Sequence, residues 1–308
     1  MKKLYPLKLT PVLREKTWGS EKLLVSGLDG SPSVVENGFL ADNDLPDILE
    51  TYMGDLVGDE VFEYFNLQFP VTVKQILAKQ NLSVQVHPDD NTAMVRYDSY
   101  GKDEMLFVTD VQGDAGLYIG FKEKIDATQL FNACADGSVV DLLQEFRPEK
   151  GGIYHIPAGT VHAIGGGVSA VEVSQPGDIT FRLYDWGREN NPDTRREMNI
   201  EEALDLIDYG PWDPSSQCRG LNVVTVRLAG KTAISTEEFK SALIYTCIRG
   251  NTILTYKDVE YSLREGETML VPASLDEFVL SPENGECTLI RATVPETGQD
   301  TDSYITNL

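Results

Sequence analysis

Residues 151–162, GGIYHIPAGTVH, and residues 266–277, GETMLVPASLDE, follow one pattern. In each, a glycine precedes a short apolar run that ends at a proline, and the gap from Gly151 or Gly266 to that proline is the same. A glycine turn, a short strand and a proline turn are the connection found between successive strands of a jelly roll. The chain is therefore predicted to be mainly β, with two jelly rolls.

The two repeats also predict two domains with different chemistry. Five residues after its proline, the first repeat has His162, whereas the second has Glu277 and no histidine nearby. Only the first is expected to hold a metal ion. We expect a metal-binding domain with helical insertions over residues 1–235 and a second, metal-free jelly roll over residues 236–308.

Helical insertions are predicted at three places. Residues 44–58, DLPDILETYMGDLVG, combine an early proline, helically spaced apolar residues and a closing glycine. Residues 126–146 have helical spacing interrupted by an Asp-Gly pair. Over residues 199–209, Asn199 and Glu202 have the form of a capping box at the start of a helix.

The composition narrows the class of protein. The 308 residues are 41% hydrophobic, enough for a substantial core, and acidic residues exceed basic ones by 49 − 26 = 23. That charge disfavours nucleic acid, and it means that any phosphorylated substrate needs a local cluster of Lys or Arg. The chain has no apolar run of about 20 residues, no signal-peptide pattern and no CxxC pair among its four cysteines. We expect a cytoplasmic protein that binds neither nucleic acid nor membrane.

Residues 82–87, LSVQVH, contain the first candidate for a site. Ser83, Gln85 and His87 alternate with a leucine and two valines, so a strand would turn the polar side chains to the barrel interior and the apolar ones outward. A half-solvated strand would give the same pattern. The residues that follow favour a site.

Two further groups can join His87. Glu104 stands just before an apolar run, and His162 follows a proline turn, so both are associated with strands that can converge inside one barrel. Imidazole nitrogen and carboxylate oxygen are ligands that suit zinc, and a catalytic zinc site keeps an open position. The three residues therefore predict a metal site.

Four ordered segments resemble the hallmark segments of the type I mannose-6-phosphate isomerases of the cupin superfamily; they are SVQVHPDD, YGKDEM, IPAGTVHAIGGG and EVSQPGDITFRLYDWGR. The resemblance implies two cupin-like jelly-roll barrels and one zinc ion per chain. It places His87, Glu104 and His162 as metal ligands, with Gln85 as the fourth.

The same resemblance assigns residues around the metal. Arg182 falls at the position of the catalytic arginine, and its place on a predicted strand fits, since an inward arginine needs an anionic partner. Lys102, Ser83, Glu172 and Asp178 fall at positions that line the substrate cavity, with Lys102 the candidate for holding a phosphate. Glu172 and Asp178 are equally explained as structural acids that orient the metal ligands or the arginine.

The implied reaction is the interconversion of mannose 6-phosphate and fructose 6-phosphate through a cis-enediol. Zinc and Arg182 would stabilise the negative charge on the sugar oxygens. Glu172, Asp178 and a metal-bound water all remain candidates for the group that transfers the proton. The oligomeric state cannot be predicted from the sequence.

Two other functions are compatible with the sequence. Residues 23–34, LLVSGLDGSPSV, replace a longer passage of the family, and loss of part of the cavity wall would leave a non-catalytic cupin that binds a sugar phosphate. A metal-dependent cupin oxygenase is the second alternative, and it requires redox-active iron where the isomerase uses zinc.

Overall fold

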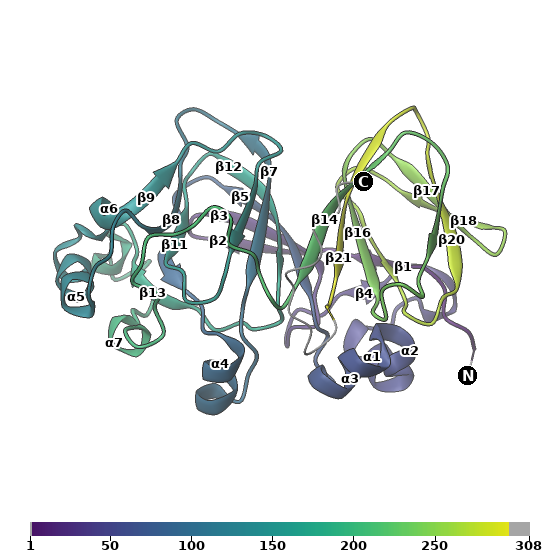
Figure 1. Ribbon diagram of the computed structural model, residues 1–308, viewed down its shortest axis with the longest axis horizontal. Helices are drawn as coiled ribbons and strands as arrows, with labels where there is room; N and C mark the ends of the chain where they lie inside the picture. The colour runs from purple at the N-terminus through teal and green to yellow at the C-terminus, as the bar shows by residue number, and fades with distance from the viewer. Residues whose placement is uncertain (1, 296–308) are drawn as a thin grey trace. The chain divides into compact units, whose positions relative to one another are not determined.

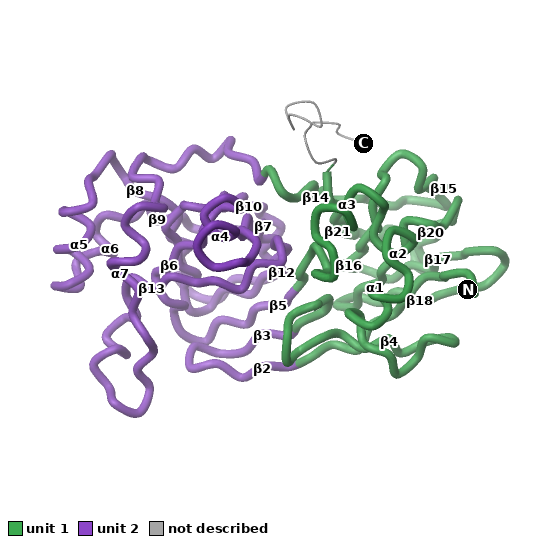
Figure 2. Tube along the Cα trace, turned by 90° about the horizontal axis from the view of Figure 1, so that it is seen from below, with its two compact units in different colours: residues 1–12, 23–73, 219–308 green, residues 13–22, 74–218 purple. Residues whose placement is uncertain are grey.

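The computed structural model describes residues 2–295, which form two compact units (Figures 1 and 2). Unit 2 comprises residues 13–22 and 74–218, and unit 1 comprises the chain up to residue 12, residues 23–73 and the chain from residue 219 onward. This division differs from the expected boundary between residues 235 and 236. The reason is that strand β1 (Leu7–Thr10) pairs with strand β19 (Thr268–Val271), so the start of the chain folds with the C-terminal strands.

Unit 2 contains most of two sheets. The larger has the order β10-β7-β12-β5-β3-β2, with strands Ile153–Ile156, Glu104–Val111, Val168–Ser174, Thr72–Ala78, Gly19–Val25 and Val12–Lys16. The smaller has the order β13-β6-β11-β8-β9, with strands Phe181–Tyr184, Val84–Val86, His162–Ile164, Leu117–Phe121 and Leu143–Phe146.

Unit 1 has a similar pair of sheets. The larger has the order β14-β21-β16-β19-β1-β4, with strands Asn222–Leu228, Cys287–Thr293, Leu243–Arg249, Thr268–Val271, Leu7–Thr10 and Val34–Val35. The smaller has the order β15-β20-β17-β18, with strands Thr232–Ser235, Glu277–Pro282, Thr252–Tyr256 and Val259–Leu263.

The sequence repeat corresponds to a repeat in structure. Gly151 and Gly266 both adopt a positive φ, 89° and 81°, which glycine tolerates without strain. The apolar runs that follow form β10 and β19, and the next strands, β11 and β20, begin at His162 and Glu277. The mainly β architecture expected from the two repeats is confirmed.

The helices are shorter than predicted. They are α1 (Leu45–Tyr52), α2 (Gly54–Val57), α3 (Asp59–Phe65), α4 (Asp90–Tyr97), α5 (Ala127–Asp136), α6 (Val139–Leu142) and α7 (Ile200–Ala203), with two short 3-10 turns at Gly38–Leu40 and Arg188–Asn190. None of these helices is long and apolar enough to cross a membrane.

Two predicted helices need correction. The pattern over residues 126–146 becomes α5 and α6, but its last four residues form strand β9. The capping box at Asn199 does not form, because the Asn199 side chain instead accepts a hydrogen bond from the backbone N–H of Arg182, 3.2 Å away. The helix there ends after one turn.

The core of unit 2 lies under its helices. Val84 and Val86 pack in one cluster with Leu130 of α5 and Ala203 of α7. Figure 1 shows these two helices beside the strands of the smaller sheet. The opposite face of β6 is left for polar side chains, as the alternation predicted. Leu82, just before the strand, packs instead in a second cluster with residues of the larger sheet.

Candidate metal centre

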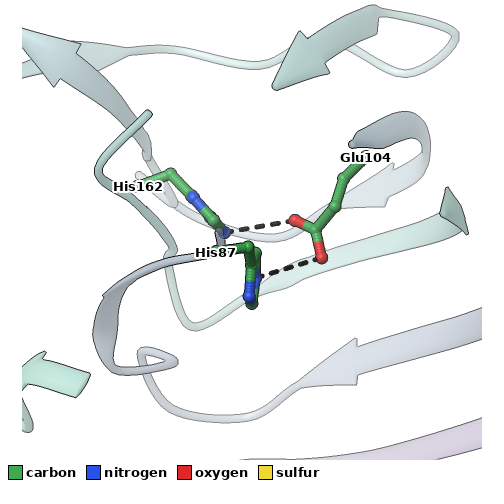
Figure 3. A group of neighbouring side chains, drawn as sticks. All are labelled: His87, Glu104 and His162. Atoms are coloured by element: carbon green, nitrogen blue, oxygen red, sulfur yellow. Dashed lines mark ion pairs between the residues drawn. The ribbon is translucent and has the colours of Figure 1, made fainter. Parts of the chain in front are cut away.

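Three buried side chains of unit 2 converge on one point (Figure 3). His87 directly follows β6, Glu104 is the first residue of β7, and His162 is the first residue of β11. Their ligand atoms all lie within 4.8 Å of one another. Among residues 2–295 this is the one group of His, Cys, Asp and Glu side chains with the spacing to share a metal ion.

Backbone carbonyls hold both imidazoles in the orientation that a metal requires. Nδ1 of His87 lies 2.8 Å from the carbonyl oxygen of Ile179, and Nδ1 of His162 lies 2.9 Å from that of Thr160. A protonated Nδ1 donates to each carbonyl, so each Nε2 keeps its lone pair, and these nitrogens lie 3.3 and 3.2 Å from the Glu104 oxygens.

The centre has unused acceptor capacity. Within the part of the chain that the structure describes, the buried Nε2 of His87 has no hydrogen-bond partner. Two imidazole nitrogens and a carboxylate form a donor set that suits zinc, with positions left open. The residues present therefore fit a metal ion.

The surroundings of His87 and Glu104 favour the protonation states that bind a metal ion. Burial and the neighbouring Lys102 lower the pKa of His87 to about 4, so the imidazole is neutral at physiological pH. Burial alone would raise the pKa of Glu104, but Lys102 and His87 hold it well below its usual range. Glu104 is thus a carboxylate.

Gln85 and Ser83 lie on the same face of the sheet as the centre. The Gln85 amide nitrogen is 3.4 Å from Nε2 of His162, and Ser83 donates a hydrogen bond to Oε1 of Gln85 at 3.1 Å. A half-turn of the amide exchanges its nitrogen and oxygen, which would present the oxygen to a metal. The predicted inward face of this strand is confirmed.

Two lysines and a second carboxylate extend the centre. Nζ of Lys102 lies 2.9 Å from Oε1 of Glu104 and 3.9 Å from Oε1 of Glu172. Nζ of Lys74 lies 2.8 Å from the same Glu172 oxygen. Burial and the charge of Glu104 raise the pKa of Glu172, against the effect of the two lysines.

Lys74 was missed by the sequence analysis. The signal was present, because residues 72–78, TVKQILA, contain one lysine in an otherwise largely apolar strand. A lysine at such a position is buried only when an acid pairs with it.

Arg182 and Asp178 are placed differently. Arg182 is half-buried on β13, directly opposite Gln85 of β6, and its Nη1 donates to the carbonyl oxygen of Glu197 at 2.7 Å. Burial and the nearby Arg196 lower the pKa of Arg182. Asp178 is exposed in the turn before β13, so it does not join the buried group.

Seven of the nine site residues named from the sequence thus gather at or beside the centre, Arg182 lies one strand away, and Asp178 faces solvent. The seven are His87, Glu104, His162, Gln85, Ser83, Lys102 and Glu172.

Known proteins resemble this chain over most of its length. It is 28% identical over 312 aligned residues to the mannose-6-phosphate isomerase ManA of Bacillus subtilis, covering 89% of this chain and 95% of the relative. It is 24% identical to a mannose-6-phosphate isomerase of Streptococcus mutans, covering 92% and 99%. Residues 221–294 match the model of the cupin domain of mannose-6-phosphate isomerase.

Solved structures agree with the fold. The crystal structure of the mannose 6-phosphate isomerase from Bacillus subtilis superposes with a TM-score of 0.81 at 25% identity, covering 94% of this chain and all of that one. A mutant of phosphomannose isomerase from Salmonella typhimurium shares the fold, with a TM-score of 0.75 at 17% identity and coverage of 94% and 100%. The resemblance stated from the four sequence segments, and the fold of two cupin-like jelly rolls with a helical insertion, are confirmed.

Proposed function

We propose that this chain is a metal-dependent aldose-ketose isomerase that interconverts mannose 6-phosphate and fructose 6-phosphate, with one zinc ion held by His87, Glu104, His162 and Gln85. The observation that carries the proposal is the buried pair of imidazoles facing a carboxylate, with two lysines and Glu172 beside them. The near full-length similarity to mannose-6-phosphate isomerases supports it.

The reaction requires a cation where charge develops. Moving a proton between C1 and C2 through a cis-enediol puts negative charge on the two sugar oxygens. A bound zinc ion supplies Lewis-acid stabilisation of that charge. The residues of this chain would hold the ion with two imidazoles and a carboxylate in a buried site, where electrostatic interactions are strong.

Lys102 is better suited to the reacting end of the sugar than to its phosphate. Its ammonium lies 2.9 Å from Glu104, so it sits directly beside the metal centre. We therefore propose that Lys102 stabilises the charged sugar oxygens, in place of the phosphate role expected from the sequence. This keeps a positive charge next to the enediol.

Glu172 is the acid that we propose for proton transfer. Its Oε1 lies between two ammonium groups, and its raised pKa brings it closer to neutral pH than an ordinary glutamate. Asp178, the other acid predicted from the sequence, is exposed. Ser83 lines the same face and would contact the substrate, and Arg182 would meet charge that develops along the reaction.

A coupled assay tests the function. The purified protein should convert mannose 6-phosphate to fructose 6-phosphate, lose this activity on treatment with a chelator and recover it with zinc. Binding of the sugar phosphate without turnover would favour a non-catalytic cupin. Bound iron together with oxygen consumption would favour an oxygenase. A cytoplasmic location fits the proposed substrate, because a dianionic sugar phosphate does not cross a membrane unaided.

A further inference from the structure

The second jelly roll can be compared with the first, position by position. The repeat aligns Ile156 with Val271, because each directly precedes the proline of its repeat. In the first jelly roll Ile156 pairs with Glu104 of β7, and in the second Val271 pairs with Leu243 of β16. A leucine therefore takes the position of the metal-centre carboxylate.

The same alignment puts an arginine at the position of Glu172. Two residues further along β7, Leu106 pairs with Glu172 of β12. Two residues further along β16, Tyr245 pairs with Arg291 of β21. The position that is acidic beside the metal centre is thus basic in the second jelly roll, so it attracts an anion instead of a cation.

Tyr245 and Arg291 face the interior of the second jelly roll. The Tyr245 ring contacts the ring of Phe278 on β20, in the smaller sheet of unit 1, with centroids 5.9 Å apart. Residues opposite each other in an antiparallel pair point to the same face, so Arg291 shares this interior face. Tyr245 is fully buried, but Arg291 and its other neighbour, Val224 of edge strand β14, are partly exposed. Solvent therefore reaches the Arg291 side of this face.

Arg291 has no acidic partner in the part of the chain that the structure describes. Within residues 2–295 no carboxylate pairs with its guanidinium, and no group accepts a hydrogen bond from its buried Nε. Its Cζ lies 4.4 Å from the centroid of the Phe239 ring. Such stacking covers one face of the guanidinium and leaves the N–H donors in its plane available. An unpaired arginine is unexpected in a chain of net charge −23.

The hydroxyl of Tyr245 is a second donor without an acceptor. It is buried and has no hydrogen-bond partner among the described residues, although Arg291 is close enough for its charge to act on it. Burial raises the pKa of Tyr245 to about 12, so the hydroxyl keeps its proton at neutral pH. Buried polar groups are normally satisfied, so two neighbouring donors without acceptors indicate a place for an external one.

We propose that the second jelly roll binds a small oxyanion, the carboxylate or phosphate group of a metabolite, between Arg291 and Tyr245. The paired N–H donors of a guanidinium match two oxygens of such a group, and the hydroxyl adds a donor from the buried side. All residues of this site belong to unit 1, whereas the metal centre belongs to unit 2. The inference therefore does not depend on the proposed function.

The alternative is a purely structural role, in which Arg291 holds the turn that contains Phe239 through their stacking. The two explanations differ in a measurable property. A structural arginine contributes to the free energy of unfolding but gives the protein no affinity for an oxyanion.

Calorimetry on the full chain, with acetate and separately with inorganic phosphate, provides the test. We expect wild-type protein to bind at least one of these probes and Arg291→Gln to bind it roughly 10- to 100-fold more weakly, the loss typical of a charged hydrogen-bonding group. Arg227→Gln is the matched control, because it removes the same charge from an exposed residue of β14, and it should bind like wild type. Phosphate can also bind at the proposed substrate site, so only binding that depends on Arg291 supports the inference. The probe that shows this dependence identifies the class of ligand.

Tyr245→Phe provides a second variant, which keeps the ring against Phe278 and removes only the hydroxyl. It should bind the probe roughly 3- to 10-fold more weakly, as expected for one neutral hydrogen bond, and should lose no stability without ligand, since the hydroxyl has no partner to lose. Wild type that binds neither probe, or variants at Arg291 and Tyr245 that bind as well as the Arg227 control, would overturn the inference. An isomerase assay that shows no turnover would count against the proposed function alone.

Discussion

The choice of imidazole tautomer decides whether the centre can hold a metal ion. Both histidines use Nδ1 for a backbone carbonyl, so their free nitrogens point at Glu104. Had the carbonyls of Ile179 and Thr160 been elsewhere, the same residues could pair among themselves as an ordinary buried network. The ligand geometry thus depends on two loops whose sequences carry no ligand.

His162→Gln should abolish zinc binding while leaving the fold intact. The variant loses one of the nitrogen ligands, and the loss of affinity should exceed the roughly 10- to 100-fold that is typical when only an outer partner of a ligand is removed. Elemental analysis of the purified variant measures the zinc, and circular dichroism checks the fold. Retention of one zinc per chain would place the metal elsewhere.

Arg182→Ala should lower kcat by about 10²- to 10³-fold with little change in zinc content, if the arginine meets charge that develops in the reaction. Steady-state kinetics and elemental analysis on the same preparation measure both. A near-normal kcat would show that Arg182 has only a structural role, through its hydrogen bond to the carbonyl of Glu197. A variant that unfolds would point to the structural explanation.

At the scale of elements, the two faces of strand β6 have different roles. The valines on one face pack in the core, and Gln85 on the other face lies beside the metal centre. Val86→Ala removes two methyl groups from the core under α5 and α7 and should cost about 2 kcal/mol of unfolding free energy without altering zinc affinity. Gln85→Ala, on the other face, should weaken zinc binding with little effect on stability. Urea unfolding of the metal-free proteins and zinc titration distinguish them. Equal effects of both variants on both quantities would contradict the assignment of faces.

The segment after β13 should be sensitive to acid through Asp185. Burial alone would raise its pKa, but hydrogen bonds from Arg196 and Arg188 lower it below the ordinary value. A lowered pKa in the folded state stabilises the protein above the unfolded pKa, about 3.9, and this contribution is lost as the pH falls through the folded pKa. Asp185→Asn should therefore be destabilised by about 3 kcal/mol at neutral pH.

The difference between this variant and wild type should shrink below about pH 4, where Asp185 of the unfolded chain begins to be protonated, and it should disappear only below the lowered pKa of the folded state. Urea unfolding at neutral pH and at the lowest pH where both proteins remain folded gives the comparison. A difference in unfolding free energy that is independent of pH would show that the ion pairs with Arg188 and Arg196 do not provide the stability.

At the scale of the whole molecule, the features that could be predicted from the sequence are those encoded by neighbouring residues. Contacts between residues far apart in the chain could not be predicted. The alternation of LSVQVH predicted the inward face that His87 shares with Gln85, and the two Gly-Pro repeats predicted two β units, because both are properties of neighbouring residues. The pairing of β1 with β19 joins residues more than 250 positions apart, and no local pattern encodes it.

Contacts between residues far apart in the sequence also limited what could be predicted about the site. Lys74 reaches Glu172 from a strand almost 100 residues earlier in the chain, and the Asn199 side chain bonds Arg182 instead of capping its own helix. In both cases a tertiary contact determined what the side chain does. Charged residues inside strands are where such contacts should be sought first.

The net charge of the chain gives the last prediction. A sugar phosphate dianion approaches a protein of charge −23, so the long-range field repels it while Lys74, Lys102 and Arg182 attract it locally. At about 10 mM ionic strength the Debye length is roughly 30 Å and the whole charge acts, whereas at 0.15 M it is about 8 Å and mainly the nearby groups act. KM for mannose 6-phosphate should therefore fall as salt rises between these limits. Steady-state kinetics over a salt series measure it, and a KM that rises steadily with salt would show that the local positive groups dominate the field even at long range.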